Sequence, residues 1–515
     1  MNITLALHRG ALMHGDRTAL VCGAVRVTWR ELKSRTARLA GALRVLGLEP
    51  GGRVGILADA GIPYFEFHYG VPWAGGAHVP LNIRLSDAEL VDILNDAEIG
   101  ILIVGAEYAD RLATLRRGAK TLRTIIAIGG APGALDYETL LAAATPAEDA
   151  RRSGEDLLAI MYTGGTTGRP KGVMHSVGNA VANLLAAIPN MEFSEDMVYL
   201  HTTPLFHAAG SARVYGTMTA LGTGIILPRF DVPDLLRAVA THRVTHLLLV
   251  PTMINRLLNA PEFAHTDLSS LTNLAYGASI MPEALLRKAL ELLPNVRFTQ
   301  SYGMTELSPS AACLQPKYHV LEGRLAGRIK SIGQPIHTAE IRIADEYDRE
   351  LPLGEVGEIQ VRGPMVMQGY WRQPELTAQT LRGGWMHTGD AGYMDEHGFV
   401  FLIDRIKDMV ITGGENVYSG EVENAIYEHP KVRECAVIGL PDPDFGERVH
   451  AIVVPHPGEA LAPEEIIAHC RRLIAHYKCP RSVEVRHDPL PLSATNKILK
   501  TALRRQYLET EKGLR

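Results

Sequence analysis

The chain has 515 residues, of which 46% are hydrophobic and 21% charged, and its formal net charge is −5. A single hydrophobic core does not organise so long a chain, so we expect two or more domains. The composition, with 49 glycines, is that of a soluble globular α/β protein and excludes a fibrous or disordered chain. The charges are spread along the chain, which gives no reason to expect a nucleic-acid partner.

The cysteines and the N-terminus bear on the cellular compartment. The five cysteines form no C-x-x-C pair and no metal-ligand spacing, a pattern typical of a reducing compartment. No basic region precedes the short apolar stretch at the N-terminus, and no run approaches the roughly 18 apolar residues of a membrane span. We expect a cytoplasmic protein without a transmembrane segment, and we leave peripheral membrane contact and a homodimer open.

In the N-terminal half, apolar runs of strand length alternate with helical patterns. The helical segment 28–47 is amphipathic, and strand-like runs lie near Val54, Ile101, Ile125, Ile225 and Leu248. This alternation predicts parallel or mixed sheets covered by helices. Gly222 and Gly224 begin a G-x-G, but the third glycine of a dinucleotide fingerprint is missing.

The pattern changes after about Gly333. Segments 339–363 and 391–405 have short alternating strands joined by Gly/Asp turns, which predicts a small β-barrel-like or hairpin layer. Past Arg405 a further αβ pattern is long enough to form its own domain. We predict an α/β fold with a large N-terminal domain and a small mobile α+β C-terminal domain, with these bounds: domain 1–405, hinge 406–408 and domain 409–515.

The stretch "YTGGTTGRPKG", residues 162–172, follows an apolar run directly. Glycines let successive backbone N–H groups turn toward one centre, threonine hydroxyls add donors, and Lys171 adds a mobile charge. These features suit a phosphate chain. The P-loop pattern is not met, because Lys171 follows Pro170 and precedes Gly172. A flexible surface linker is the alternative.

Two further segments carry candidate ligand-binding groups. In "SYGMTE", residues 301–306, Tyr302 offers a ring for stacking, Thr305 a hydroxyl and Glu306 a carboxylate for Mg²⁺; a packed turn is the alternative. If "DEHG", residues 395–398, is a hairpin turn, Asp390 and Arg405 lie opposite each other and suit a ribose diol. A surface ion pair is the alternative there.

The last two segments lie near the predicted domain boundary and the C-terminus. Lys407 and Asp408 precede the Gly413-Gly414 pair, so this junction is either a hinge or a solvated linker. Lys497 in "PLSATNKILK" follows a loop of small residues and is either carried into a site by domain motion or simply exposed.

Taken together and in this order, these motifs resemble the adenylate-forming superfamily of acyl-CoA synthetases, nonribosomal adenylation domains and beetle luciferases. The resemblance covers nearly the whole chain and is carried by "YTGGTTGRPKG", "YGMTE", "HTGD" and "DRIKDMVITGGENVYSGEVE". Within that superfamily, the sequence is most similar to bacterial acyl-CoA synthetases of the fatty-acid and aryl-acid type.

The resemblance implies ATP, Mg²⁺ and coenzyme A as cofactors and assigns roles to particular residues. Glu306 would hold Mg²⁺, Thr305 would contact the α-phosphate, and Asp390 with Arg405 would hold the ribose. The adenine would lie on Tyr302 and Gly303, against a strand edge formed by Gly277, Ala278 and Ser279. The β- and γ-phosphates would be wrapped by Thr163, Gly164, Gly165, Thr166, Thr167, Gly168 and Lys171.

The resemblance also implies two half-reactions. Lys497 would bridge the carboxylate and the α-phosphate while the acyl adenylate forms, and His207 in "PLFHAAG" would border the acyl pocket near the thiol tunnel. The C-terminal domain would then rotate about Lys407, withdraw Lys497 and present Gly413 and Gly414 to pantetheine.

Two positions depart from the family pattern. Asn496 stands where glycine commonly precedes the lysine, and Arg213 aligns with a position that often faces the acyl pocket. An inward Arg213 indicates a polar or second carboxylate group on the substrate, whereas an arginine reaching the surface from a helix carries no such meaning. The predicted acyl pocket comprises His207, Ala208, Gly210, Arg213 and Tyr276, and its balance of small and large residues predicts a medium-chain, cyclic or aromatic carboxylic acid.

Two other functions stay open at this stage. The first is an adenylating ligase that loads a carrier protein in trans. It stays open because a carrier protein and CoA present the same reactive pantetheine arm. A catalytically silent nucleotide-binding protein is the alternative outside enzymes, and the joint presence of Lys171, Glu306, Asp390, Arg405 and Lys497 argues against it.

Overall fold

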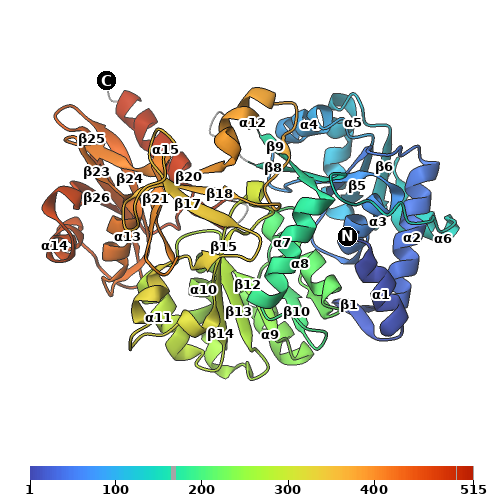
Figure 1. Cartoon of the computed structure of the whole chain (residues 1–515), viewed down its shortest axis with the longest axis horizontal. Helices are drawn as coiled ribbons and strands as arrows, with labels where there is room; N and C mark the ends of the chain where they lie inside the picture. Colours follow the sequence, from blue (N-terminus) through green and yellow to red (C-terminus); the bar gives the residue numbers. More distant parts are fainter. Residues whose placement is uncertain (164–169, 494–495, 514–515) are drawn as a thin grey trace.

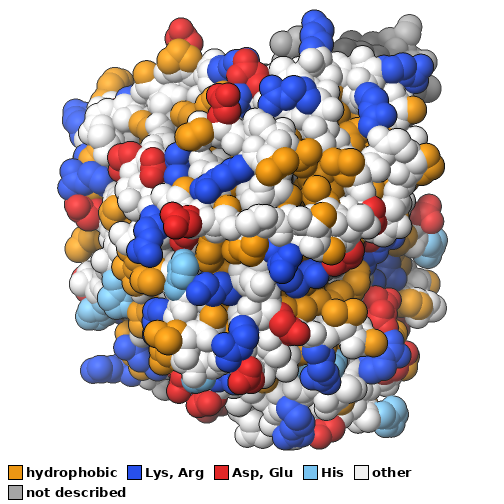
Figure 2. Space-filling view, turned by 90° about the vertical axis from the view of Figure 1, so that its right-hand side faces the viewer, with side chains coloured by type: hydrophobic (Ala, Val, Ile, Leu, Met, Phe, Trp, Pro, Cys, Tyr) orange, Lys and Arg blue, Asp and Glu red, His pale blue; other side chains and the backbone are white. Residues whose placement is uncertain are grey.

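The computed structural model describes residues 1–163, 170–493 and 496–513 of the chain (Figure 1). The N-terminal elements, drawn in blue and green, form helix-covered sheets, and the dark-orange and red C-terminal elements, such as β25 and α14, lie at one end of the molecule. The face formed by the N-terminal elements mixes basic, acidic and hydrophobic side chains (Figure 2). In the described part of the chain, no helix combines the length and apolar character that a bilayer span needs.

Sheet I has the strand order β19-β9-β8-β4-β3-β5-β6-β7. Strands β3 to β7 pair in parallel, whereas β8 and β9 pair antiparallel and flank the glycine-rich loop. The bounds are β3 Arg53–Leu57, β4 Ala77–Pro80, β5 Ile101–Gly105, β6 Thr124–Ile128, β7 Leu135–Asp136, β8 Leu157–Thr163, β9 Lys171–Ser176 and β19 Gly369–Tyr370.

Sheet II has the order β16-β15-β14-β13-β12-β10-β11-β1-β2. Because β12, β13 and β14 are parallel, their carboxyl ends meet at one edge, where Gly277 pairs with Ser301. The bounds are β1 Thr18–Cys22, β2 Val25–Thr28, β10 Val198–His201, β11 Thr223–Ile226, β12 His246–Leu249, β13 Asn273–Gly277, β14 Arg297–Tyr302, β15 Ala312–Leu314 and β16 Gln334–Pro335.

Helices cover both sheets, and α3, α7 and α8 contribute to a hydrophobic core that also contains side chains from strands of both. Helix α3 is apolar around most of its circumference, as a helix buried between layers should be. The bounds are α1 Leu5–Met13, α2 Trp29–Val45, α3 Ile62–Ala74, α4 Asp87–Asp96, α5 Leu112–Gly118, α6 Tyr137–Ala143, α7 Val177–Asn190, α8 Ala208–Thr219, α9 Val232–His242, α10 Pro251–Leu258, α11 Glu283–Leu292 and α12 Pro374–Thr380.

The expected small β layer is sheet III, an antiparallel sheet with the order β17-β18-β20-β21. Its bounds are β17 Glu340–Ala344, β18 Gly357–Arg362, β20 Met386–Met394 and β21 Val400–Arg405. Strands β20 and β21 form the hairpin predicted from the sequence, and Asp395 to Gly398 make its turn.

The C-terminal part contains sheet IV, in which every strand comes from Val410 onward. Its own buried core also lies beyond residue 409, as a separate folding unit requires, although the domain bounds themselves stay a prediction. The bounds are β22 Val410–Thr412, β23 Glu415–Val417, β24 Val432–Asp442, β25 Gly446–Pro455, β26 Ser482–Val485, α13 Ser419–Tyr427, α14 Pro463–Leu473 and α15 Lys500–Gly513.

Short 3₁₀ helices connect several of these elements, and two of them fall on predicted functional segments. Thr305 and Glu306 lie in one, and the predicted hinge is another. Their bounds are Ala106–Arg111, Pro261–His265, Thr305–Leu307, Pro316–Tyr318, Ala326–Lys330, Arg382–Gly384, Ile406–Asp408 and His476–Lys478.

Candidate active site

Asp390 and Arg405 face each other across the β20–β21 hairpin. They are paired residues in the strand register, and Arg405 Nε lies 3.0 Å from Asp390 Oδ1. The hydroxyl of Tyr302, at the end of β14, donates a hydrogen bond of 2.7 Å to Asp390 Oδ2. The end of sheet II therefore meets the end of a hairpin in sheet III at one carboxylate.

The environment of Asp390 leaves one of its oxygens available. Burial raises the pKa of this carboxyl, while the Arg405 charge and the Tyr302 hydrogen bond oppose the rise. Although the Arg405 guanidinium is close to Oδ1, it does not have hydrogen-bond geometry toward that oxygen, which is buried without a partner among the described residues. A buried acceptor of this kind fits a ligand hydroxyl such as that of a ribose.

Glu306 lies beside two groups from sheet I. Tyr370 donates a hydrogen bond of 2.8 Å from its hydroxyl to Glu306 Oε1. Lys171 Nζ lies 5.5 Å from the centre of the Tyr370 ring. His175 Nε2 lies 2.7 Å from the carbonyl oxygen of Thr305, so β9 also anchors the backbone of this segment. Sequence reasoning missed Tyr370, which carries no motif of its own.

Two predicted adenine-site glycines are required by close backbone approach. A Cβ at Gly277 would collide with the carbonyl oxygen of Ser301, and one at Gly303 would collide with that of Pro309. The next residue, Ala278, has a left-handed φ of 69°. The structure therefore brings the predicted adenine edge, which continues to Ser279, next to the end of β14.

The charge of Lys497 acts on His207. His207 precedes α8, and burial, followed by the charges of Lys497 and Arg84, lowers its pKa to about 3. Lys497 keeps part of its surface exposed, yet desolvation and the Arg405 charge lower its pKa to about 8, partly offset by Asp390. The lysine amine, a neutral imidazole and the Asp390–Arg405 pair thus share one site.

The loop that carries Lys497 is docked on the N-terminal part through its backbone. Arg84 Nη1 donates a hydrogen bond of 2.8 Å to the carbonyl of Ser493, and Thr252 Oγ1 donates one of 2.6 Å to that of Asn496. Asn496 has a left-handed φ of 58°, a conformation that glycine favours and asparagine tolerates. This conformation explains why the family commonly has glycine at this position and why asparagine can replace it.

The other predicted C-terminal residues lie earlier in the chain than the Lys497 loop. Lys407 is in the 3₁₀ helix at the predicted hinge. Gly413 and Gly414 form the β22–β23 turn with φ of 60° and 84°, and the N–H of Gly413 donates to the carbonyl of Phe445.

Gly164, Gly165, Thr166, Thr167 and Gly168 lie outside the described residues, and their neighbours Thr163 and Lys171 are paired across the β8–β9 ladder.

The predicted acyl-pocket residues lie in different surroundings, and only some of them line a cavity. Ala208 lines a cavity of about 30 Å³ between α7 and α8, together with His78, His175 and Ser308. A Cβ at Gly210 would collide with the carbonyl oxygen of Pro204, so this glycine is a packing requirement.

Tyr276 and Arg213 are both buried. Tyr276 packs in the core beside α9, α10 and α11 and hydrogen-bonds His319 at 3.0 Å, so it lines neither this cavity nor the larger one described next. Arg213 is only 1% exposed, so it does not reach the surface from α8.

A larger cavity of about 380 Å³ lies beside the segment that precedes His207. Its lining includes Phe206, Asn496 and the three arginines Arg84, Arg229 and Arg256. Asp59 pairs with Arg229 at 2.7 Å, so the other two guanidinium groups leave the cavity net positive. These arginines were not singled out by sequence reasoning, because they come from three separate segments.

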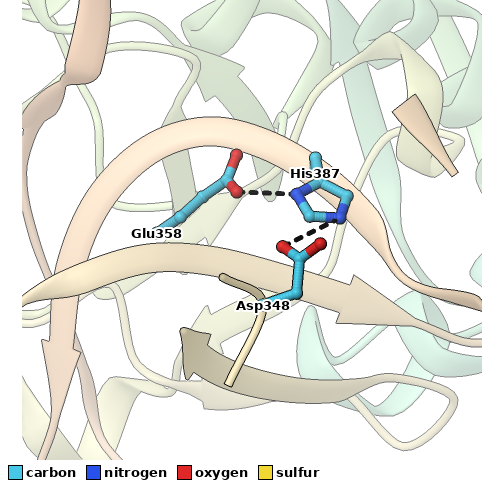
Figure 3. A group of neighbouring side chains, drawn as sticks. All are labelled: Asp348, Glu358 and His387. Atoms are coloured by element: carbon cyan, nitrogen blue, oxygen red, sulfur yellow. Dashed lines mark hydrogen bonds and ion pairs between the residues drawn. The ribbon is translucent and has the colours of Figure 1, made fainter. Parts of the chain in front are cut away.

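A further cluster consists of Asp348, Glu358 and His387 (Figure 3). His387 Nδ1 lies 2.7 Å from Glu358 Oε2, and Arg382 Nε lies 2.8 Å from Asp348 Oδ2. A protein cation therefore already balances the aspartate. Glu358 Oε1 accepts the Gly389 N–H at 2.9 Å, so the cluster braces the backbone immediately before Asp390.

Comparison with known proteins agrees with this geometry. The AMP-binding enzyme family matches residues 7–371, and the AMP-binding enzyme C-terminal domain family matches residues 421–497. Feruloyl-CoA synthase of Amycolatopsis sp is 40% identical over 500 residues, covering 97% of this chain and 98% of that protein. Long-chain-fatty-acid–CoA ligase FadD13 of Mycobacterium tuberculosis is 34% identical, with 94% of each chain covered.

Two solved structures share the whole fold. The anthranilate CoA ligase AuaEII in complex with anthranoyl-AMP superposes with a TM-score of 0.90 at 27% identity, covering 98% of this chain and 97% of that one. The amide bond synthetase McbA from Marinactinospora thermotolerans superposes with a TM-score of 0.88 at 31% identity, covering 98% and 100%.

The fold and these matches define an adenylate-forming enzyme, and the chain belongs to the AMP-binding enzyme family. Within that family it is an AMP-forming acyl-CoA synthetase, which joins a carboxylic acid to coenzyme A with ATP as the activating substrate.

Proposed function

We propose that this synthetase acts on a medium-chain, cyclic or aromatic carboxylic acid. Ala208 and Ala209 follow His207 along α8 with short side chains, whereas Arg213 occupies volume farther along the helix. The relatives named above include enzymes for ferulate, anthranilate and long-chain fatty acids, so family membership alone allows both aryl and alkyl acids.

The observation that carries the assignment of the nucleotide site is the arrangement of Arg405 and Tyr302 around the buried Asp390 carboxylate, with Arg405 beside Oδ1 and Tyr302 bonded to Oδ2. In the proposal, Asp390 and Arg405 hold the ribose hydroxyls of ATP. Tyr302 fixes the carboxylate through its hydroxyl while its ring borders the base, and Gly277, Ala278, Ser279 and Gly303 form the backbone edge beside the adenine. Thr305 contacts the α-phosphate.

In the first half-reaction the substrate carboxylate attacks the α-phosphorus, and the bond to the pyrophosphate leaving group breaks. Negative charge on the phosphate oxygens is stabilised by the Lys497 amine, and this stabilisation is strong because the amine is mostly desolvated. Lys171 and the glycine-rich loop retain the β- and γ-phosphates. His207 is neutral at physiological pH and borders the acid without adding charge.

Glu306 would hold Mg²⁺, which supplies charge neutralisation to the phosphates when bound. The residues fit such an ion, because a carboxylate oxygen is the ligand that Mg²⁺ prefers. The Tyr370 hydroxyl fixes the orientation of this carboxylate.

In the second half-reaction the CoA thiol attacks the acyl carbon, AMP leaves and the thiol proton is released. The net positive cavity beside Phe206 has the size and charge to receive part of a phosphorylated acceptor such as CoA. We propose that the C-terminal part rotates about Lys407 between the two steps, withdraws Lys497 and brings Gly413 and Gly414 to the pantetheine arm.

We place the reaction in the cytoplasm, where ATP and CoA are available and where the five free thiols of the protein stay reduced. The proposal is tested with a panel of acids from acetate to palmitate together with benzoates and cinnamates, with pyrophosphate release and CoA consumption measured separately. Best turnover on acetate or palmitate contradicts the proposed acid. Pyrophosphate release without CoA consumption indicates a carrier-protein acceptor.

A further inference from the structure

Arg213 is a buried guanidinium without a counter-ion. It is 1% exposed, and neither its Nε nor its Nη1 has a hydrogen-bond acceptor among the described residues. None of the ion pairs found in the described part of the chain includes it. A charge removed from water is strongly disfavoured unless it is paired, so an arginine retained here points to a partner that the protein itself does not supply.

The surroundings of Arg213 are otherwise apolar or neutral. Its guanidinium lies 5.9 Å from the centre of the Phe193 ring. Its charge acts on Tyr199 in β10 and on Cys313 in β15, which lie on either side of β12 and β13 in the order of sheet II. The guanidinium therefore lies between α8 and the central strands of this sheet. The buried Tyr199 hydroxyl is close enough to stabilise the charged guanidinium, but the two groups do not meet hydrogen-bond geometry.

This region packs against strands that end near the predicted adenine edge. Phe193 and Tyr199 cluster with Leu248 of β12 and Ala275 of β13, whose strand ends two residues later at Gly277 beside the adenine edge. His207 marks the opening of the site, and Arg213 lies six residues farther along, a rise of about 9 Å in an α-helix.

A short side chain lies one helical turn before Arg213 on α8. Ala209 shares the face of α8 that carries Arg213 and keeps part of its surface exposed, whereas Arg213 is fully buried.

We infer that Arg213 receives a second oxygen of the substrate acid, at the end remote from the reacting carboxylate. The inference rests on the proposed function and narrows its substrate class to acids that carry a distal acceptor oxygen. A phenol, a ring ketone and a second carboxylate share this chemistry, because each presents an oxygen to the donors of a guanidinium. Tyr199 supplies a further hydroxyl to the same group.

The test compares pairs of acids that differ only in the distal oxygen: cinnamate with 4-hydroxycinnamate, hexanoate with adipate, and cyclohexanepropanoate with its 4-oxo derivative. Pyrophosphate release is measured at saturating ATP. The wild-type kcat/KM should favour the oxygen-bearing acid by about tenfold or more in one pair, as expected for a hydrogen bond to a charged group. The pair that responds identifies the oxygen.

Arg213→Met, which keeps the length of the side chain, should abolish that preference mainly through KM, and Arg213→Lys should retain part of it. The oxygen-bearing acid should raise the Tm of the wild type and no longer raise that of Arg213→Met. Arg237→Met on the exposed face of α9 is the control and should keep both responses.

Two results would overturn the inference. In one, Arg213→Met lowers kcat/KM equally for both members of every pair, which is the signature of a structural role. In the other, the wild type prefers the unsubstituted acid in all three pairs. Failure of the proposed function looks different, because then no medium-chain, cyclic or aromatic acid of the panel supports efficient pyrophosphate release, whatever stands at position 213.

Discussion

The Ser419 hydroxyl donates a hydrogen bond of 2.6 Å to Asp404 Oδ2, and the N–H of Gly420 lies 3.3 Å from the same oxygen. Asp404 belongs to β21, before the predicted hinge, and Ser419 is the first residue of α13, beyond it. The carboxylate therefore caps a helix that belongs to the C-terminal part. Lys500 donates to Ser419 at 2.6 Å and pairs with Glu423, so α15 joins the same contact.

Because this cap favours the arrangement in which Lys497 lies near the Asp390–Arg405 pair, Asp404→Ala should slow adenylation by about tenfold or more, the loss expected for a hydrogen bond to a charged group. Thioester formation from supplied acyl adenylate should be affected less. Rates of the two half-reactions, measured separately, check this expectation, with Ser419→Ala as the variant that removes only the donor. Equal losses in both steps would show that the cap does not discriminate between conformations.

Lys497 and Lys407 are expected to affect opposite half-reactions. Lys497→Ala should lower adenylation about a hundredfold to a thousandfold, because it removes a charge that stabilises the transition state of that step. CoA consumption from pre-formed adenylate should survive. Lys407→Pro should leave adenylation competent and impair the thioester step, because a fixed φ hampers rotation. The two-conformation mechanism is wrong for this protein if the first variant damages both steps equally or the second damages neither.

Glu306→Gln should leave the fold intact and lower adenylation by orders of magnitude. The amide oxygen still accepts the Tyr370 hydrogen bond, but a neutral amide is a far weaker Mg²⁺ ligand than a carboxylate. Pyrophosphate release across a Mg²⁺ titration is the measurement. Tyr370→Phe, which keeps the carboxylate and removes only its donor, should lose much less activity. A folded Glu306→Gln protein with near-wild-type release would contradict the assignment.

The pH dependence of adenylation should report Lys497. Its pKa is lowered from 10.5 to about 8, so the amine loses its proton at a lower pH than a free lysine does. Since the charged form is required, kcat/KM for pyrophosphate release should fall above pH 8, approaching about tenfold per pH unit. Lys497→Arg stays charged over this range, so its remaining activity should lack the decline. A wild-type profile that is flat to pH 10 would contradict the role of this amine.

Local geometry was predictable from the sequence, and long-range contacts were not. Asp390 and Arg405 were expected to face each other because a hairpin register follows from counting residues on either side of the turn, and the structure pairs them. The contact between Tyr370 and Glu306 joins β19 of sheet I to the 3₁₀ helix that follows β14 of sheet II, and no count along the chain reveals it. The three arginines of the larger cavity were not predicted either, because they come from three separate segments of the chain.

Tyr276 is a neighbour of Gly277 in sequence, but its side chain lies in the hydrophobic core. It stands next to Gly277, which suggested a position in the acyl pocket. Side chains alternate along a strand, however, and the structure places Tyr276 on the face opposite Ala275, in the core under α10 and α11. Its assignment to the pocket stays a prediction without support from the cavities of the structure.

Arg84 and Thr252 hold the Lys497 loop by donating hydrogen bonds to its peptide carbonyls. Every amino acid offers the same carbonyl, so the identity of the side chains at positions 493 and 496 has little bearing on this grip, provided that position 496 tolerates a left-handed backbone. Substitutions at positions 493 and 496 should therefore have little effect on this contact, whereas replacing Arg84 or Thr252 removes a donor. An engineer who grafts the C-terminal part of another synthetase onto this chain need match only the backbone path of the loop, and should keep Arg84 and Thr252.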